Sequence, residues 1–162
     1  MTAALVAARR LVVFSRGHSS ALAEFMVRRL VRSGYEAVAP TNVDWEAPEQ
    51  LARLQAGDVL LVFAFRGLRA EVERLLAFAH QRGVRTVLIG DFIGTSVREK
   101  PGHLLLAPRG EEGEYQSFLV PMAICSILIL ELTRRDEGRS IRALERIGEV
   151  KEMLAAARRN LP

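Results

Sequence analysis

Two short loops of this sequence carry side chains that could bind an anion. The first loop, residues 15–20 (SRGHSS), combines one glycine with three hydroxyls and two side chains that can be cations. The N-terminus of a helix exposes unpaired backbone N–H groups and carries a partial positive charge. The N–H groups of Ser19, Ser20 and Ala21 could therefore donate to a phosphate, with the serine hydroxyls as further donors. We expect an anion cradle made of Ser15, Gly17, His18, Ser19 and Ser20.

The same loop allows a simpler interpretation, in which Ser19 or Ser20 only caps the following helix and Gly17 only turns the chain. Two nucleotide-binding motifs are excluded. A dinucleotide fingerprint needs three glycines, and Gly17 is the only glycine between Phe14 and Gly34. A P-loop needs a GK[ST] tripeptide, which does not occur in this sequence.

The second loop, residues 65–69 (FRGLR), places two guanidinium groups around a glycine. Arginine side chains match phosphate or carboxylate oxygens with two parallel hydrogen bonds. We therefore add Arg66, Gly67 and Arg69 to the candidate ligand-binding residues. In the simpler interpretation, both arginines are solvated or paired with Glu71 or Glu73.

Hydrophobic periodicity predicts the elements that bring the two loops together. Short apolar runs predict strands at residues 11–14, 36–39, 58–65, 85–89 and 103–107. Helical patterns predict helices at residues 21–31, 47–54, 68–81 and 115–134. This alternation indicates an α/β fold, a three-layer αβα sandwich whose five-stranded parallel sheet has the flavodoxin-like order 2-1-3-4-5. In that order both loops lie at the crevice between the first and third strands.

The chain resembles the sugar isomerase (SIS) phosphosugar-binding domain, especially the C-terminal effector domain of RpiR-type transcriptional regulators. The resemblance rests on VVFSRGHSSALAEF, GDVLLVFAFRG and RTVLIGD, and covers about residues 3–133. Of the family's G-x-G-x-S-S opening, Gly17, Ser19 and Ser20 match, while Ser15 replaces the first glycine.

Other positions depart from the family pattern. At the third strand, Ala64 and Arg66 stand where the family usually has phosphate-binding serines. At the fourth strand, Gly90 and Phe92 replace the hydroxyls of a common T-D-S motif. A domain kept only for dimerisation is one hypothesis that these losses favour.

The resemblance implies a domain that senses a sugar phosphate or a similar anionic metabolite. Isomerases of this fold often place a glutamate at the start of the helix after the last strand, where this sequence has Tyr115 and Gln116. An amide cannot act as a general base. We therefore expect no catalytic residue, and the alternative, an aldose–ketose sugar-phosphate isomerase, would have to use His18 or one of the glutamates at 111, 112 and 114.

Composition limits the partners and the location. The chain has 162 residues, 49% of them hydrophobic, which is enough for one sizeable core. Residues 139–159 hold six basic and three acidic side chains, so much of the net charge of +4 lies in this tail. No zinc-finger, RNP or helix-turn-helix pattern occurs, so we expect no direct nucleic-acid contact from this domain.

Several absences lead to further expectations. The longest apolar run, residues 118–130, is shorter than the about 20 residues of a membrane-spanning helix, so we expect no membrane partner. The N-terminal arginines follow the apolar residues, whereas in a secretory signal the charges come first. Cys125 is the single cysteine, so no internal disulfide can form. We therefore expect the protein to be located in the reducing cytoplasm. The histidines at 18, 80 and 103 have no metal-ligand spacing. We expect no metal and no cofactor.

The helix pattern at residues 117–132 is apolar on nearly every side, which predicts that the helix is covered on every side. Its own sheet can cover only part of such a helix, so we expect a homodimer. We expect residues 1–134 to form the SIS-like domain with a lead-in helix. Residues 135–162 then form a helical extension packed on the domain or its partner, or else a solvated helix. The DNA-binding part of an RpiR-like regulator would lie outside this chain.

Overall fold

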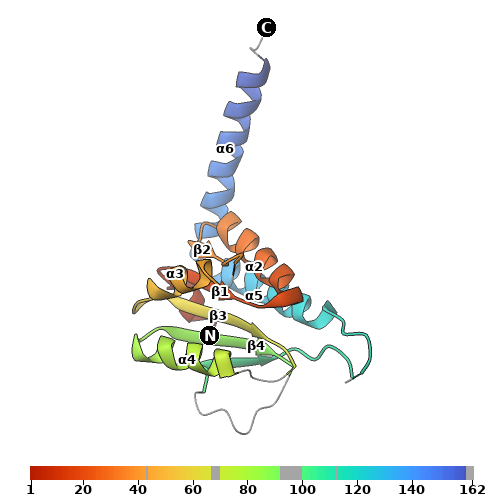
Figure 1. Ribbon diagram of the computed structural model, residues 1–162. Helices are drawn as coiled ribbons and strands as arrows, with labels where there is room; N and C mark the ends of the chain where they lie inside the picture. The colour runs from red at the N-terminus through yellow and green to blue at the C-terminus, as the bar shows by residue number, and fades with distance from the viewer. Residues whose placement is uncertain (43, 67–69, 92–99, 112, 160–162) are drawn as a thin grey trace.

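The computed structural model describes residues 1–42, 44–66, 70–91, 100–111 and 113–159. Its five strands are β1 (Leu11–Phe14), β2 (Ala37–Val38), β3 (Val59–Ala64), β4 (Arg85–Gly90) and β5 (His103–Leu106). All neighbouring strands are parallel, and their order in the sheet is β2-β1-β3-β4-β5 (Figure 1). The predicted sheet and strand order are confirmed.

The helices are α1 (Thr2–Val6), α2 (Ser20–Arg32), α3 (Glu46–Ala52), α4 (Ala70–Gln81), α5 (Leu119–Arg135) and α6 (Arg139–Arg159). Helix α5 begins four residues later than predicted. The backbone N–H of Ser117 donates to the Arg109 carbonyl at 2.8 Å, and the Ser117 hydroxyl accepts from the Leu119 N–H at 3.1 Å. These bonds hold the segment before α5 outside the helix.

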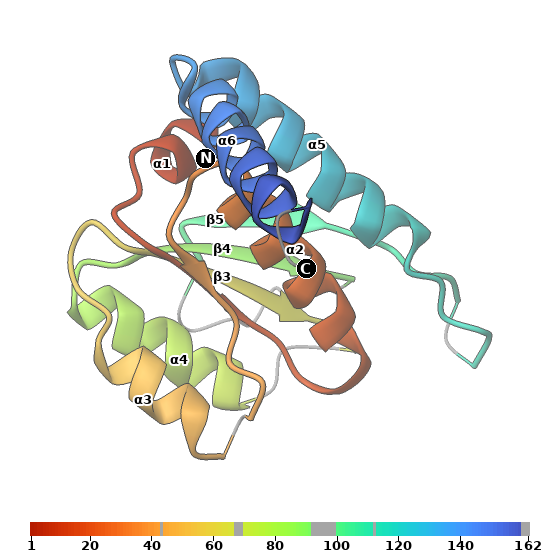
Figure 2. The ribbon, with the colours of Figure 1, turned by 90° about the horizontal axis from the view of Figure 1, so that it is seen from above.

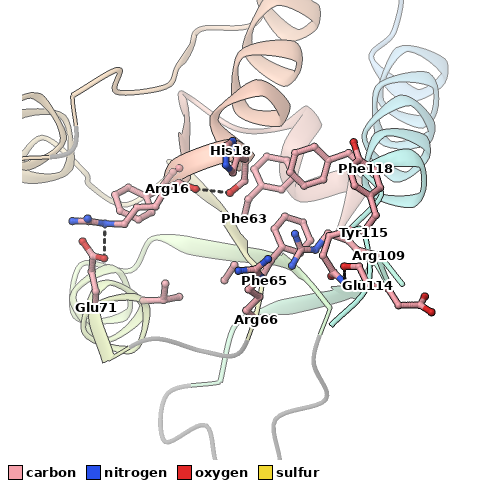
Figure 3. Close-up of a pocket in the computed structure, with 16 residues that line it drawn as sticks. Arg16, His18, Phe63, Phe65, Arg66, Glu71, Arg109, Glu114, Tyr115 and Phe118 are labelled. Carbon is pink, nitrogen blue, oxygen red and sulfur yellow. Dashed lines mark hydrogen bonds and ion pairs between the residues drawn. The ribbon is translucent and has the colours of Figure 1, made fainter. Parts of the chain in front are cut away.

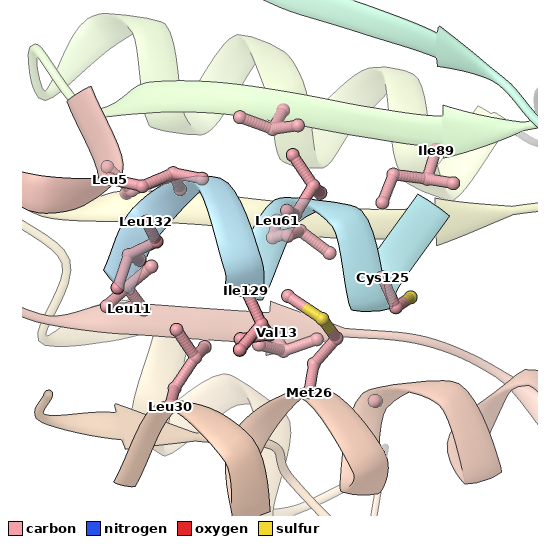
Figure 4. Packing of buried hydrophobic residues seen from close by; sticks show 14 of the residues in the cluster. Leu5, Leu11, Val13, Met26, Leu30, Leu61, Ile89, Cys125, Ile129 and Leu132 are labelled. Atoms are coloured by element: carbon pink, nitrogen blue, oxygen red, sulfur yellow. The ribbon is translucent and has the colours of Figure 1, made fainter. Parts of the chain in front are cut away.

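The strands β1, β3 and β4 are buried between two layers of helices, and their successive side chains point to opposite faces of the sheet. The edge strand β5 is largely exposed. Leu11 and Val13 of β1 pack with α1, α2 and α5, whereas Val12 and Phe14 belong to the cluster that includes α3 and α4 (Figure 2). In the first layer, Met26 of α2 and residues of α5 meet over Val13 (Figure 4). The predicted three-layer sandwich is confirmed.

Helix α5 is covered on one face only within one chain, as expected for an apolar helix that its own sheet can cover only in part. Its buried face packs into the core through Cys125, Leu128, Ile129 and Leu132. Its other face is an exposed apolar stripe, made of Leu119 (76% exposed), Val120 (39%), Ile127 (57%) and Leu130 (58%). We call these four residues the α5 stripe.

Helix α6 is attached to the domain by its first turns and then projects away from it (Figure 1). The Arg139 Nε donates to the Gly34 carbonyl at 3.0 Å, and the Ser140 hydroxyl lies 3.4 Å from the Ser33 carbonyl. Ala143 is buried against Gly34, where an added Cβ would lie 2.9 Å from the Ala143 Cβ. The small residue at 34 lets the two segments approach closely. No helix in the described part of the chain is long and apolar enough to cross a membrane.

Candidate functional site

A cavity of about 740 Å³ opens at the carboxyl ends of β1 and β3 (Figure 3). Its walls come from the turn after β1, the end of β3, the first turn of α4 and the segment before α5. The structure thus brings the first loop and the described part of the second loop together at the point where the winding of the sheet reverses, as the strand order requires.

The predicted site residues differ in where they lie. Gly17, His18, Ser19 and Arg66 line the cavity. Ser15 is buried at the end of β1 and Ser20 is exposed on the first turn of α2, and neither is among the lining residues. The remaining two predictions, Gly67 and Arg69, lie outside the described residues.

The backbone of the first loop differs from the expected helix start. Residues Gly17–Ser19 form a 3₁₀ turn, η1, that runs directly into α2. The backbone N–H groups at the end of this turn donate to the carbonyls of Gly17 and His18, so the N–H of Ser20 is used within the chain. At the start of a helix, the N–H groups of the first residues have no partner within the helix. Here these residues are Gly17, His18 and Ser19, whereas the prediction was Ser19, Ser20 and Ala21.

One serine hydroxyl of the first loop is bonded within the turn. The Ser19 hydroxyl donates to the Arg16 carbonyl at 2.7 Å, which fixes the turn. Ser19 occupies the N-cap position of α2, one of the two capping serines of the simpler interpretation, but its hydroxyl makes no capping hydrogen bond.

The cations of the cavity have different partners. The Arg16 Nε lies 2.7 Å from Glu71 Oε2 (Figure 3), so Glu71 pairs with Arg16 and not with Arg66. The Arg66 side chain is exposed and has no ion pair with another described residue. Its backbone has φ +62°, in the left-handed region that non-glycine residues rarely adopt.

Two residues that were not among the predicted site residues, Asp91 and Arg109, form an ion pair at the cavity. Arg109 lines the cavity, and Asp91 is the aspartate at the T-D-S position. The Arg109 Nε and Nη2 donate to Asp91 Oδ2 at 3.0 and 2.7 Å, and both side chains are largely buried. The other carboxylate oxygen, Asp91 Oδ1, accepts the backbone N–H of Arg66 at 2.8 Å. Both residues come within three residues of the end of a predicted strand. The carboxyl ends of parallel strands lie at one edge of the sheet, so this position in the sequence could have identified both as candidate site residues.

Aromatic side chains form one wall of the cavity. The Phe65 ring centroid lies 6.4 Å from that of Phe63 and 6.1 Å from that of Phe118. The Arg109 Cζ lies 4.3 Å from the Phe65 centroid, a cation–π distance. Ala64 lines the cavity beside them, without a hydroxyl. Phe92, the other predicted loss of a hydroxyl, lies outside the described residues.

Two side chains from the segment before α5, those of Glu114 and Gln116, bear on whether the cavity could transfer a proton. Gln116 lines it, but its Nε2 donates to the carbonyls of Glu111 at 2.7 Å and Glu114 at 3.3 Å, which holds the segment before α5. Glu114 also lines the cavity and has no ion pair with another described residue. Among the described residues, no group of three or more His, Cys, Asp or Glu side chains is placed to hold a metal ion.

Comparison with known proteins places this chain in a protein family. The family model described as the SIS domain matches residues 4–131. A search of curated proteins found no match. Similar solved structures include the sugar isomerase domain of the RpiR transcription factor from Sphaerobacter thermophilus, with TM-score 0.80 and 23% identity over 91% of this chain and 83% of that one.

Two further structures have a similar fold. The Vibrio vulnificus NanR protein complexed with ManNAc-6P has TM-score 0.79 and 19% identity, over 94% of this chain and 59% of that chain. Phosphoheptose isomerase GmhA from Neisseria gonorrhoeae has TM-score 0.59 and 19% identity, over 84% of each chain. The similarity to a regulator and to an enzyme shows the shared fold.

Proposed function

Because the chain belongs to the SIS domain family, we propose that it binds a sugar phosphate or a related anionic metabolite as the effector-sensing domain of an RpiR-like transcriptional regulator. The observation that carries the proposal is the Arg66 guanidinium, which lines the cavity with no ion pair to another described residue. Arg16 and Arg109 are each neutralised by a carboxylate. An anionic group would give Arg66 a charge-assisted partner.

Other parts of the cavity fit the same ligand. The N–H groups at the start of η1 and the exposed His18 line the same cavity as Arg66 and can donate to phosphate oxygens. The wall of Phe65 and Phe118 offers apolar surface to the carbon skeleton of a ligand. The fold similarity to NanR, which was solved with ManNAc-6P, supports a sugar phosphate as the ligand class.

An aldose–ketose sugar-phosphate isomerase remains the second candidate, and Glu114 favours it. Proton transfer between adjacent carbons needs a base at the substrate, and Glu114 is a carboxylate of the cavity without an ion pair to another described residue. The amide of Gln116 is held by backbone carbonyls and cannot take this role. The fold similarity to phosphoheptose isomerase is compatible with this candidate.

We also propose that the domain works as a homodimer through the α5 stripe. The stripe begins at Leu119, next to Phe118 of the cavity wall. On α6, the face that buries Ala143 continues as Ile147, Val150 and Leu154 beyond the domain. A second copy supplies the same apolar faces, as a two-fold interface requires.

The remaining expectations belong to the same proposal. Residues 1–134 act as the sensing domain and residues 135–162 as its helical extension. Contact with DNA is made by another part of the regulator. The single buried Cys125 supports a location in the reducing cytoplasm.

A thermal-shift panel tests ligand binding. A ligand at about 100 times its dissociation constant stabilises the fold by about 2.7 kcal/mol, which is a melting shift of several degrees. We expect a selective shift with one or a few sugar phosphates, and a reduced shift in Arg66→Gln. Arg28→Gln is the matched control, because Arg28 is exposed on α2 and pairs with Glu24.

The panel separates the candidate functions. Equal shifts with sulfate and every phosphate would indicate a generic anion site. No shift with any phosphate contradicts the sensor and favours a domain used for dimerisation only. Interconversion of an aldose phosphate and its ketose, abolished by Glu114→Gln, would establish the isomerase.

A further inference from the structure

We propose that Asp91 is the positioning residue of the cavity, and that it presents Arg66 to the anionic group of the ligand while Arg109 keeps Asp91 in place. The inference rests on the proposed function for the identity of the ligand. The positioning itself rests on the geometry at the ends of three strands. Asp91 directly follows β4, Arg66 follows β3 and Arg109 follows β5.

The two oxygens of the Asp91 carboxylate have separate partners. Oδ1 accepts the backbone N–H of Arg66 at 2.8 Å. Arg66 has φ +62°, a conformation that a side chain with a Cβ disfavours. A hydrogen bond from this N–H to a charged acceptor compensates for the disfavoured backbone. The bond thereby selects the backbone conformation from which the Arg66 side chain extends along the cavity.

Arg109 fixes the other oxygen of the same carboxylate. Its Nε and Nη2 both donate to Asp91 Oδ2, at 3.0 and 2.7 Å. The Arg109 guanidinium lies over the Phe65 ring, with Cζ 4.3 Å from the ring centroid, and the Arg109 side chain is 7% exposed. A guanidinium buried to this degree needs its counter-charge. Arg109 therefore stays paired with Asp91 and serves as a wall of the cavity, which leaves anion contact to Arg66.

The backbone of Arg109 extends the same connection. Its carbonyl accepts the Ser117 N–H at 2.8 Å, so Arg109 also holds the segment that leads into α5. Asp91 and Arg109 together tie the end of β3 to the entry of α5. The anion-contacting residue and the aromatic wall of Phe65 and Phe118 are thus held relative to each other by one ion pair.

Two double variants separate the effect of the hydrogen-bond acceptor at position 91 from the effect of its charge. Asp91→Asn with Arg109→Gln removes both charges and keeps an oxygen that can accept the Arg66 N–H. Asp91→Ala with Arg109→Gln has the same net charge and no such oxygen. We expect the alanine double variant to bind inorganic phosphate and glucose 6-phosphate about two- to tenfold more weakly than the asparagine double variant, the size of a lost hydrogen bond to a neutral amide oxygen.

Hydrogen exchange at the Arg66 amide gives a readout that does not need a ligand. We expect this amide to be protected in the wild type and in the asparagine double variant, and to exchange about two- to tenfold faster in the alanine double variant. Asp91→Glu, which keeps the charge and moves the oxygens by one methylene, should also speed exchange and covers the case in which the alanine double variant does not fold.

The outcomes for the two proposals are distinct. Unchanged protection of the Arg66 amide in the alanine double variant or in Asp91→Glu overturns the positioning role. Equal phosphate affinity of the two double variants also overturns it. A wild-type protein that shows no thermal shift with any phosphate of the panel, but loses Arg66 protection on removal of the acceptor, overturns the proposed function and leaves the positioning intact.

Discussion

The Arg16 Nε lies 2.7 Å from Glu71 Oε2, so an ion pair joins the turn after β1 to the first turn of α4 across the mouth of the cavity (Figure 3). Both side chains are about half-exposed, 44% and 39%. An ion pair at this exposure is weak. An anionic ligand that contacts Arg16 therefore competes with Glu71 for it at a small energetic cost.

Removing the charge of Glu71 should strengthen anion binding. We expect Glu71→Gln to raise the affinity for inorganic phosphate by about two- to fivefold, the size of a weak surface ion pair. Isothermal titration calorimetry at constant ionic strength measures the change. Glu73→Gln is the matched control, since Glu73 lies on the same helix and does not line the cavity. A gain that is equal in both variants would mean that only the overall charge matters.

The α5 stripe should hold the dimer together. We expect a molar mass of about twice 18.0 kDa for the wild type by light scattering at micromolar concentration. Ile127→Glu combined with Leu130→Glu places charges on the stripe and should give monomers, because unpaired charges are costly to bury. Val31→Glu, at an exposed apolar position of α2, is the control and should stay dimeric. A monomeric wild type would contradict the proposed dimer.

The attachment of α6 depends on the absence of a side chain at Gly34. Gly34 has φ +80°, and an added Cβ would lie 2.9 Å from the Ala143 Cβ. We expect Gly34→Ala to lower the free energy of unfolding by about 1–3 kcal/mol, because backbone strain and a steric clash act together.

Urea unfolding of a second glycine variant provides the comparison. Gly148 lies within α6, and nothing lies within 4 Å of an added Cβ there. Gly148→Ala should leave stability unchanged or raise it by up to about 1 kcal/mol, as expected for a helix interior. Equal effects of the two substitutions would refute the close packing of Gly34 and Ala143.

Tyr35 should make the fold sensitive to alkaline pH. Burial, and after it the nearby Asp136 carboxylate, raise the pKa of Tyr35 to about 12. The protonated phenol therefore contributes stability below its ordinary pKa of 10.0, and this contribution is lost as the pH rises toward 12. Tyr35→Phe keeps the ring under Arg139, whose Cζ lies 4.1 Å from the ring centroid, and removes the ionisation.

We expect Tyr35→Phe to lose less stability than the wild type between pH 10 and 12, the range of the raised pKa. Urea unfolding at a series of pH values measures the difference. Tyr115→Phe is the control, because Tyr115 is 94% exposed. If the free energy of unfolding had the same pH dependence in the wild type and in Tyr35→Phe, ionisation of the Tyr35 phenol would not destabilise the fold.

Local patterns were sufficient to predict the fold. Each strand is a short apolar run, and each helix between strands has a helical period, so element types follow from neighbours a few residues apart. Parallel strands joined by helices allow few topologies. Strand order then placed the loop at Gly17 beside the residue that follows β3, Arg66, and the structure has both in one cavity.

Only the tertiary structure decided which side chains of the cavity remain available. The sequence suggested Glu71 as a partner for the nearby Arg66, and in the fold Glu71 pairs with Arg16. Asp91 lies 25 residues from Arg66 and 18 from Arg109, and no local pattern joins the three. Their contacts exist because three strand ends meet at one edge of the sheet. Side-chain pairing over such sequence separations depends on distances that arise only when the strands pack.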